Sequence, residues 1–218
     1  MTTAALRSET DRLTTELRTL SEEDWGLPTR CGPWTVADLV AHVSRGIARV
    51  SDCVAGPEPL SSDTDAVGYF RPGDRFSAAT DGERLASAQR AAEGMTPDEH
   101  VSLLERRLSA ALADASSRPG GRRVVTRHGD RMELGQFVLT RVIEVALHGI
   151  DVADAVGRPR WTTDEAADVL LPLFLKGHND IDIPEASEFL ARASGRAPLG
   201  PDLARRLEEA GIDLPSFG

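Results

Sequence analysis

The segment that most constrains the fold is LTRVIEVALHGIDVADAV, residues 139–156, which is apolar along most of its length. Four ionisable side chains interrupt it: Arg141, Glu144, His148 and Asp151. On a helix with about 100° of rotation per residue, these four fall within a sector of roughly 80°. A helix that is apolar over the rest of its circumference is largely buried, so its polar stripe must face water, a partner or a cavity.

Residues 1–157 are predicted to form a four-helix bundle. Apolar periodicity and capping residues predict its long helices over residues 2–20, 34–54, 81–115 and 133–156, with a break in the third near 94–97. A short strand or a hairpin is predicted over residues 123–134. The Pro- and Gly-rich residues 56–80 are predicted to form a long loop that is a candidate lid. Four long helices favour a mainly α, bundle-type fold.

Residues 158–218 are predicted to form a second, small unit that is either α or α+β. Thr162 or Thr163 is expected to cap a helix, because acidic residues follow them, and another helix is expected near residues 201–210. The predicted organisation is therefore a helical bundle over 1–157 followed by a C-terminal region over 158–218.

Composition limits the classes of partner. The formal net charge is -10 at pH 7, whereas nucleic-acid binding needs clustered basic residues, so we expect no nucleic-acid partner. No apolar run reaches membrane-spanning length and the N-terminal sequence lacks an apolar signal core, so we expect a cytoplasmic protein without membrane contact. The two cysteines, Cys31 and Cys53, have no metal-site spacing and are interpreted as ordinary thiols. We expect a monomer or a homodimer.

Two residues of the polar stripe have the spacing of metal ligands. Glu144 and His148 lie at positions i and i+4, so both side chains can reach one point, as ligand pairs do in bundle metal sites. The same pattern also fits a solvated stripe or a buried structural ion pair. The stripe alone does not decide between these three interpretations.

A third ligand has to come from another part of the chain. The other histidines are His42, His100, His128 and His178. His42 lies on the polar face of its predicted helix, where it faces solvent unless that face borders a cleft. We expect His100 to be exposed, His128 to lie in a turn and His178 to follow the end of a helix.

Two separated motifs resemble a known family. PWTVADLVAHV (33–43) and RVIEVALHGIDVADAVG (141–157) resemble the metal-binding domain of mycothiol-dependent maleylpyruvate isomerases, which belong to the DinB-like four-helix bundle superfamily. The resemblance covers residues 1–157, and FLARASGRA (189–197) is more weakly similar to the small C-terminal region of that family.

The resemblance implies a divalent metal, usually zinc in this family, held by His42, Glu144 and His148. Two histidines and one glutamate leave an open coordination position, which is typical of a catalytic site. The resemblance also implies mycothiol as a thiol cosubstrate. A metal lowers the pKa of a bound thiol and so favours the nucleophilic thiolate. The expected activity is isomerisation of a small electrophilic substrate or S-transfer to it.

The remaining residues of the stripe are expected to support this site. Asp151 either orients an imidazole, pairs with Arg141 or caps a neighbouring helix. Arg141 either neutralises Glu144, binds a substrate carboxylate or forms a structural ion pair, and Trp34 is expected to pack in the core. Two other functions stay open: a DinB-like metallohydrolase that activates water, and a metal-binding regulatory module without catalysis.

Overall fold

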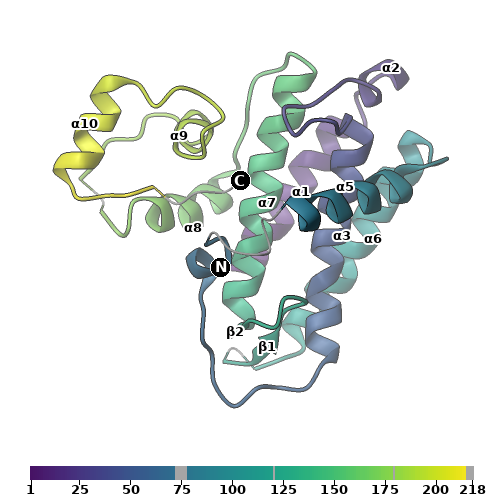
Figure 1. Ribbon diagram of the computed structural model, residues 1–218, viewed down its shortest axis with the longest axis horizontal. Helices are drawn as coiled ribbons and strands as arrows, with labels where there is room; N and C mark the ends of the chain where they lie inside the picture. The colour runs from purple at the N-terminus through teal and green to yellow at the C-terminus, as the bar shows by residue number, and fades with distance from the viewer. Residues whose placement is uncertain (72–77, 120, 179, 215–218) are drawn as a thin grey trace.

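Four long helices form a bundle in the computed structural model, which describes the chain except residues 72–77, 120, 179 and 215–218 and the side chains of 78–81 and 84. They are α1 (Thr2–Leu17), α3 (Val36–Ala55), α6 (Pro97–Ser116) and α7 (Leu134–Ala155). α1 and α3 each pack against both α6 and α7, so the four helices enclose one apolar core (Figure 1). The prediction of a mainly α, DinB-like four-helix bundle is confirmed.

Capping side chains decide where the bundle helices begin. The Thr35 hydroxyl accepts a hydrogen bond from the backbone N–H of Asp38, whose carboxylate accepts one from the Thr35 N–H, and this capping box starts α3. Thr96 and Glu99 form the same box at the start of α6. The predicted break near 94–97 is confirmed, and the residues before it form a separate helix, α5 (Ala78–Ala92), which packs against α3.

Short elements connect the bundle helices. α2 (Glu22–Trp25) follows α1, and α4 (Ala66–Tyr69) lies within the predicted long loop. Residues 72–77 of that loop lie outside the described residues, and its role as a lid stays a prediction. The predicted hairpin is confirmed: β1 (Arg123–Val125) pairs antiparallel with β2 (Arg131–Glu133), and the opposed Val124 and Met132 are fully buried against the bundle.

α7 is the central helix of the fold. It contacts α1 and α3 within the bundle and α8 and α9 of the C-terminal region. A Cβ atom at Gly149 would lie 3.1 Å from the Trp161 ring, so a glycine at this position lets the indole pack directly on α7. Neither α7 nor any other helix among the described residues has both the length and the apolar character needed to cross a membrane.

The C-terminal region packs against the bundle mainly through its first helix. It contains α8 (Asp164–Phe174), α9 (Ala186–Ala193) and α10 (Pro201–Glu209), and Figure 1 shows α9 and α10 beside the bundle. Thr163 caps α8, and its backbone N–H and hydroxyl both donate to the buried Glu9 carboxylate of α1, at 2.8 and 2.7 Å. The boundary at residue 157 stays a prediction, and α9 is a helix that the sequence pattern did not predict.

Candidate functional site

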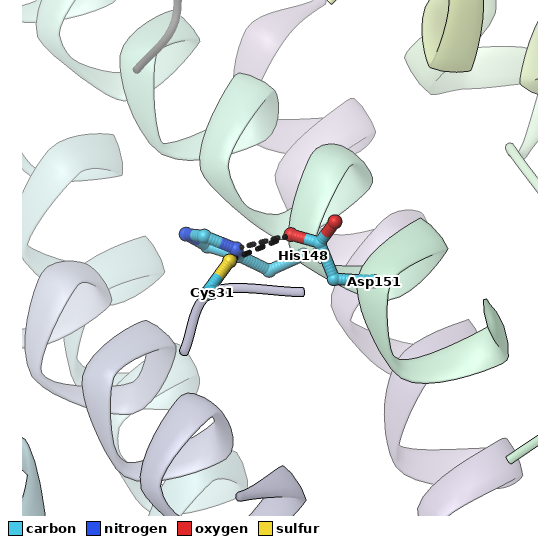
Figure 2. A group of neighbouring side chains, drawn as sticks. All are labelled: Cys31, His148 and Asp151. Atoms are coloured by element: carbon cyan, nitrogen blue, oxygen red, sulfur yellow. Dashed lines mark hydrogen bonds and ion pairs between the residues drawn. The ribbon is translucent and has the colours of Figure 1, made fainter. Parts of the chain in front are cut away.

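His148 is held on α7 by a buried carboxylate. Its Nδ1 lies 2.9 Å from Oδ2 of Asp151, whose side chain is fully buried. The carboxylate is an acceptor, so Nδ1 carries the proton and donates to it. Figure 2 shows the second ring nitrogen, Nε2, at the far end of the imidazole from Asp151. Metal-binding histidines have this arrangement, with one nitrogen bonded to a carboxylate and the other left for the metal.

The charges of this pair are strongly coupled. Burial alone would lower the pKa of His148, but the hydrogen bond to Asp151, the neighbouring Cys31 and the charge of Asp151 together outweigh burial and raise the pKa to about 9. Burial alone would raise the pKa of Asp151, but His148 and Arg196 hold it below its ordinary value. The pair therefore exists as imidazolium and carboxylate at neutral pH.

Asp151 is the centre of a larger hydrogen-bond network. Arg196, from the chain after α9, donates from Nε to Oδ1 and from Nη2 to Oδ2 of Asp151, each at 2.8 Å. The Cys31 thiol donates to Oδ2 at 3.4 Å. The position of Asp151 supports its predicted role as the group that orients an imidazole, and its ion pairs are with His148 and Arg196 rather than with Arg141.

Cys31 joins this network in a way that sequence spacing could not indicate. Ligand-type atoms of Cys31, His148 and Asp151 all lie within 4.8 Å of one another. A cation between them would have to displace the Nδ1 proton of His148 and the thiol proton of Cys31, which both form hydrogen bonds to Oδ2 of Asp151. The geometry therefore favours a hydrogen-bond network around Asp151 over a cation site at these three atoms. Cys31 was interpreted as an ordinary thiol, and the structure places this thiol next to His148 and Asp151.

His42 reaches the same site from α3. Its ring centroid lies 5.3 Å from that of His148, with the two rings almost perpendicular, and 4.7 Å from the ring of the buried Trp34. His42 is half-buried rather than fully exposed to solvent. α3 and α7 thus bring two imidazoles together. The expectation that Trp34 packs in the core is confirmed.

Glu144 lies one turn before His148 on α7 and pairs with Arg141. Arg141 Nη1 donates to Glu144 Oε2 at 3.0 Å, and its buried guanidinium lies over the rings of Phe137 and Tyr69, at 5.0 and 5.4 Å from their centres. Burial alone would lower the pKa of Arg141, but the charge of Glu144 outweighs burial and raises it. Arg141 therefore stays charged and forms an ion pair with Glu144, and its supporting role in the site stays a prediction.

A glycine of α3 makes room for this carboxylate. A Cβ atom at Gly46 would lie 2.8 Å from Glu144 Oε2. Gly46 is one helical turn beyond His42, so the Glu144 carboxylate approaches α3 next to the histidine that was predicted as its fellow ligand. A donor set of two imidazoles and one carboxylate, from two facing helices, fits a divalent metal such as zinc. The set His42, Glu144 and His148 stays a prediction.

The other histidines lie elsewhere. His100 is buried and stacks on Trp25 of α2 at 5.3 Å, so the expectation that it is exposed is wrong. Its pKa is lowered because burial disfavours the imidazolium. His128 lies in the hairpin turn and His178 follows α8, both as predicted.

The fold and the site together define the class of protein: a DinB-like helical bundle with a histidine and carboxylate site between α3 and α7. A family model described as "Mycothiol maleylpyruvate isomerase N-terminal domain" matches residues 6–153. The chain belongs to this family.

Comparison with solved structures agrees with the bundle fold. The chain resembles the crystal structure of the mycothiol-dependent maleylpyruvate isomerase with a TM-score of 0.59, and that of a histidine-to-alanine mutant of this isomerase with a TM-score of 0.61. In both cases the identity is 15%, and the match covers 91% of this chain and 90% of the other. At this identity the likeness shows the fold alone. No curated protein matches the chain.

Proposed function

We propose that this protein is a metal-dependent enzyme that uses a low-molecular-weight thiol, and that His42, Glu144 and His148 hold the metal. The observation that carries the proposal is the orientation of His148. Its Nδ1 is bonded to Asp151, and its ring meets that of His42 from the facing helix. Burial of the Asp151 carboxylate costs free energy, and a polar stripe that only faced solvent would not require it.

Each residue of the stripe has a role in this proposal. Asp151 fixes the ring of His148, and Arg141 fixes and neutralises the carboxylate of Glu144. When bound, a divalent cation supplies positive charge that lowers the pKa of a thiol or of a water molecule at its open coordination position. The chain itself supplies ligands of fixed orientation and a buried surrounding in which these charges are weakly screened.

The thiol is proposed to be mycothiol, and the substrate a small electrophile. Both rest on the names of the family and of the similar isomerases. Isomerisation and S-transfer share their first step, in which a thiolate attacks the electrophile, so the same site serves either reaction. Hydrolysis by activated water and metal binding without catalysis are the competing functions. A cytoplasmic location and the absence of a nucleic-acid partner stay predictions.

The metal site is tested by metal content after purification. We expect about one divalent ion per wild-type chain, because the proposed site uses three ligands for one metal. His148→Ala should lose the metal, while His178→Ala, which removes a histidine beyond α8, should retain it. Full metal retention by His148→Ala would refute the site.

Thiol dependence distinguishes the proposed thiol-dependent enzyme from a metallohydrolase and from a non-catalytic metal-binding protein. Binding of mycothiol is measured by calorimetry with the metal-loaded wild-type protein and with the metal-free protein. We expect binding to depend on the metal, because the thiol is proposed to occupy its open coordination position. Metal loading without any mycothiol binding would favour hydrolysis or a regulatory role instead.

A further inference from the structure

We propose that Arg196 is a positioning residue for His148 and acts through Asp151. The inference rests on the proposed function, since it concerns the orientation of a proposed metal ligand. Arg196 lies outside the bundle sequence, in the chain that follows α9. Its hydrogen bonds to Asp151, at 2.8 Å, are nevertheless the shortest that are described between the C-terminal region and the polar stripe of α7.

Arg196 spans the turn of α7 that carries His148. Its Nε donates to the backbone carbonyl of Leu147 at 3.2 Å and to Oδ1 of Asp151 at 2.8 Å. Its Nη2 donates to Oδ2 of Asp151 at 2.8 Å. The guanidinium therefore bonds to Leu147, just before His148, and to Asp151, one turn after Leu147.

Both oxygens of Asp151 are fixed by this fork. Two parallel N–H donors hold a carboxylate in one plane, and a single donor does not. His148 Nδ1 is bonded to Oδ2, the oxygen that Nη2 also holds, so the plane of the carboxylate sets the direction of the imidazole. Arg196 thereby determines where His148 directs Nε2, the nitrogen proposed to bind the metal.

Charge gives a second reason for the role of Arg196. The side chains of Asp151 and Arg196 are 0% and 3% exposed, so water solvates neither of them. A buried carboxylate needs an opposite charge and hydrogen bonds at the same place, and Arg196 supplies both. Without it, Asp151 would keep His148 and the Cys31 thiol as its described partners, and its orientation would be less determined.

The position of Arg196 is itself fixed from two directions. Its backbone N–H donates to the carbonyl of Ala191 in α9 at 2.7 Å. Arg30, next to Cys31 in the loop before α3, donates to the carbonyl of Gly195 at 3.0 Å. The C-terminal region therefore contributes to the geometry of a site whose proposed ligands all lie in the bundle.

The experiment compares metal affinity in three variants and the wild-type protein. Arg196→Ala removes the fork, and Arg196→Lys keeps the charge but not the planar geometry. Arg160→Ala is the matched control, because Arg160 also joins α7 to α9, through Asp154 and Glu188, without touching the site. Zinc affinity is measured by competition with a chromophoric chelator, and the cobalt(II) absorption spectrum reports ligand geometry.

We expect Arg196→Ala to weaken zinc binding about 10- to 100-fold, as loss of a group that orients a metal ligand does. Arg196→Lys should recover part of this loss and show a shifted cobalt spectrum, and Arg160→Ala should bind like the wild-type protein. Wild-type affinity in Arg196→Ala, or an equal loss in Arg160→Ala, would overturn the inference.

Two further outcomes are also decisive. If Arg196→Ala does not fold, Arg196→Lys decides, and a wild-type affinity and spectrum in that variant would overturn the inference. A wild-type protein that binds no zinc would overturn the proposed function and this inference with it. Zinc binding by the wild-type protein together with an unaffected Arg196→Ala overturns the inference alone.

Discussion

Zinc binding to this protein should release about one proton from His148 at pH near 7.5. The metal needs a neutral imidazole with a free Nε2, whereas Asp151 raises the pKa of the metal-free His148 to about 9. With that pKa the ring is protonated in roughly 97% of molecules at pH 7.5, against roughly 9% for an unshifted histidine. Metal binding should therefore release about 0.9 more proton per metal than it would from an unshifted histidine. The same difference is expected for any His148 pKa well above 8.

The sign of the pH dependence follows from the same shift. A proton must leave before the metal binds, so the apparent zinc affinity should rise with pH. Between pH 6.5, the ordinary histidine pKa, and the raised pKa of about 9, deprotonation of His148 should raise the apparent zinc affinity about tenfold per pH unit. An unshifted His148 would give a rise that levels off above about pH 6.5 instead.

Calorimetry in several non-coordinating buffers measures the proton count. The slope of the observed enthalpy against the ionisation enthalpy of the buffer equals the number of protons released. Asp151→Asn should reduce this number by about 0.9, because it removes the charge that raises the pKa of His148. Asp154→Asn is the control, since Asp154 pairs with Arg160 one turn further along α7. Equal proton release by Asp151→Asn and the wild-type protein would refute the coupling.

Three other predictions concern glycine packing, a buried histidine and a helix cap. Gly46→Ala should weaken zinc binding, measured by chelator competition, because its Cβ would lie 2.8 Å from Glu144 Oε2 and push that carboxylate away. His100→Gln should reduce the loss of stability on acidification from about pH 7.5 to 5.5, measured by urea unfolding. Burial lowers the folded-state pKa of His100, so the unfolded chain binds more protons below the reference pKa of 6.5. Thr163→Ala should lower the free energy of unfolding by about 1–2 kcal/mol, because the variant loses the cap of α8 and a bond to the buried Glu9.

These predictions have internal controls. Gly82→Ala adds a methyl group in α5 where, apart from its own stretch of helix, no atom lies within 4 Å, so it should leave zinc binding unchanged. Thr162→Ala removes a hydroxyl that donates to the neighbouring Trp161 carbonyl, and it should cost less stability than Thr163→Ala. An unchanged acid sensitivity in His100→Gln would mean that His100 is not the group responsible.

Local chemistry was enough to predict most of the bundle. The capping box at Thr35 uses residues three positions apart, and the period of apolar residues is visible within each helix. The polar stripe of α7 was visible for the same reason, because its members lie on neighbouring turns. α9 was missed because it has eight residues, too few turns for a periodic pattern to stand out from its surroundings.

Contacts between distant segments account for what the sequence did not reveal. Cys31 and Arg196 meet Asp151 across 120 and 45 residues of chain, and no local rule relates loops so far apart. His100 was expected to be exposed, yet Trp25 of α2 stacks against it. In each case the missing information was which loop or short helix covers the end of a bundle helix.

The balance of charges along α7 explains why a largely apolar helix carries several ionisable groups. Arg141 neutralises Glu144, and Arg196 neutralises Asp151, so the two ion pairs contribute no net charge. The imidazolium of His148 is then the unbalanced charge among these five groups. A dication approaching this site meets positive charge until His148 loses its Nε2 proton, so metal binding and proton release must occur together. A site built only to bury ion pairs would not need this fifth group, and proton release on metal binding therefore tests whether α7 is shaped for a metal.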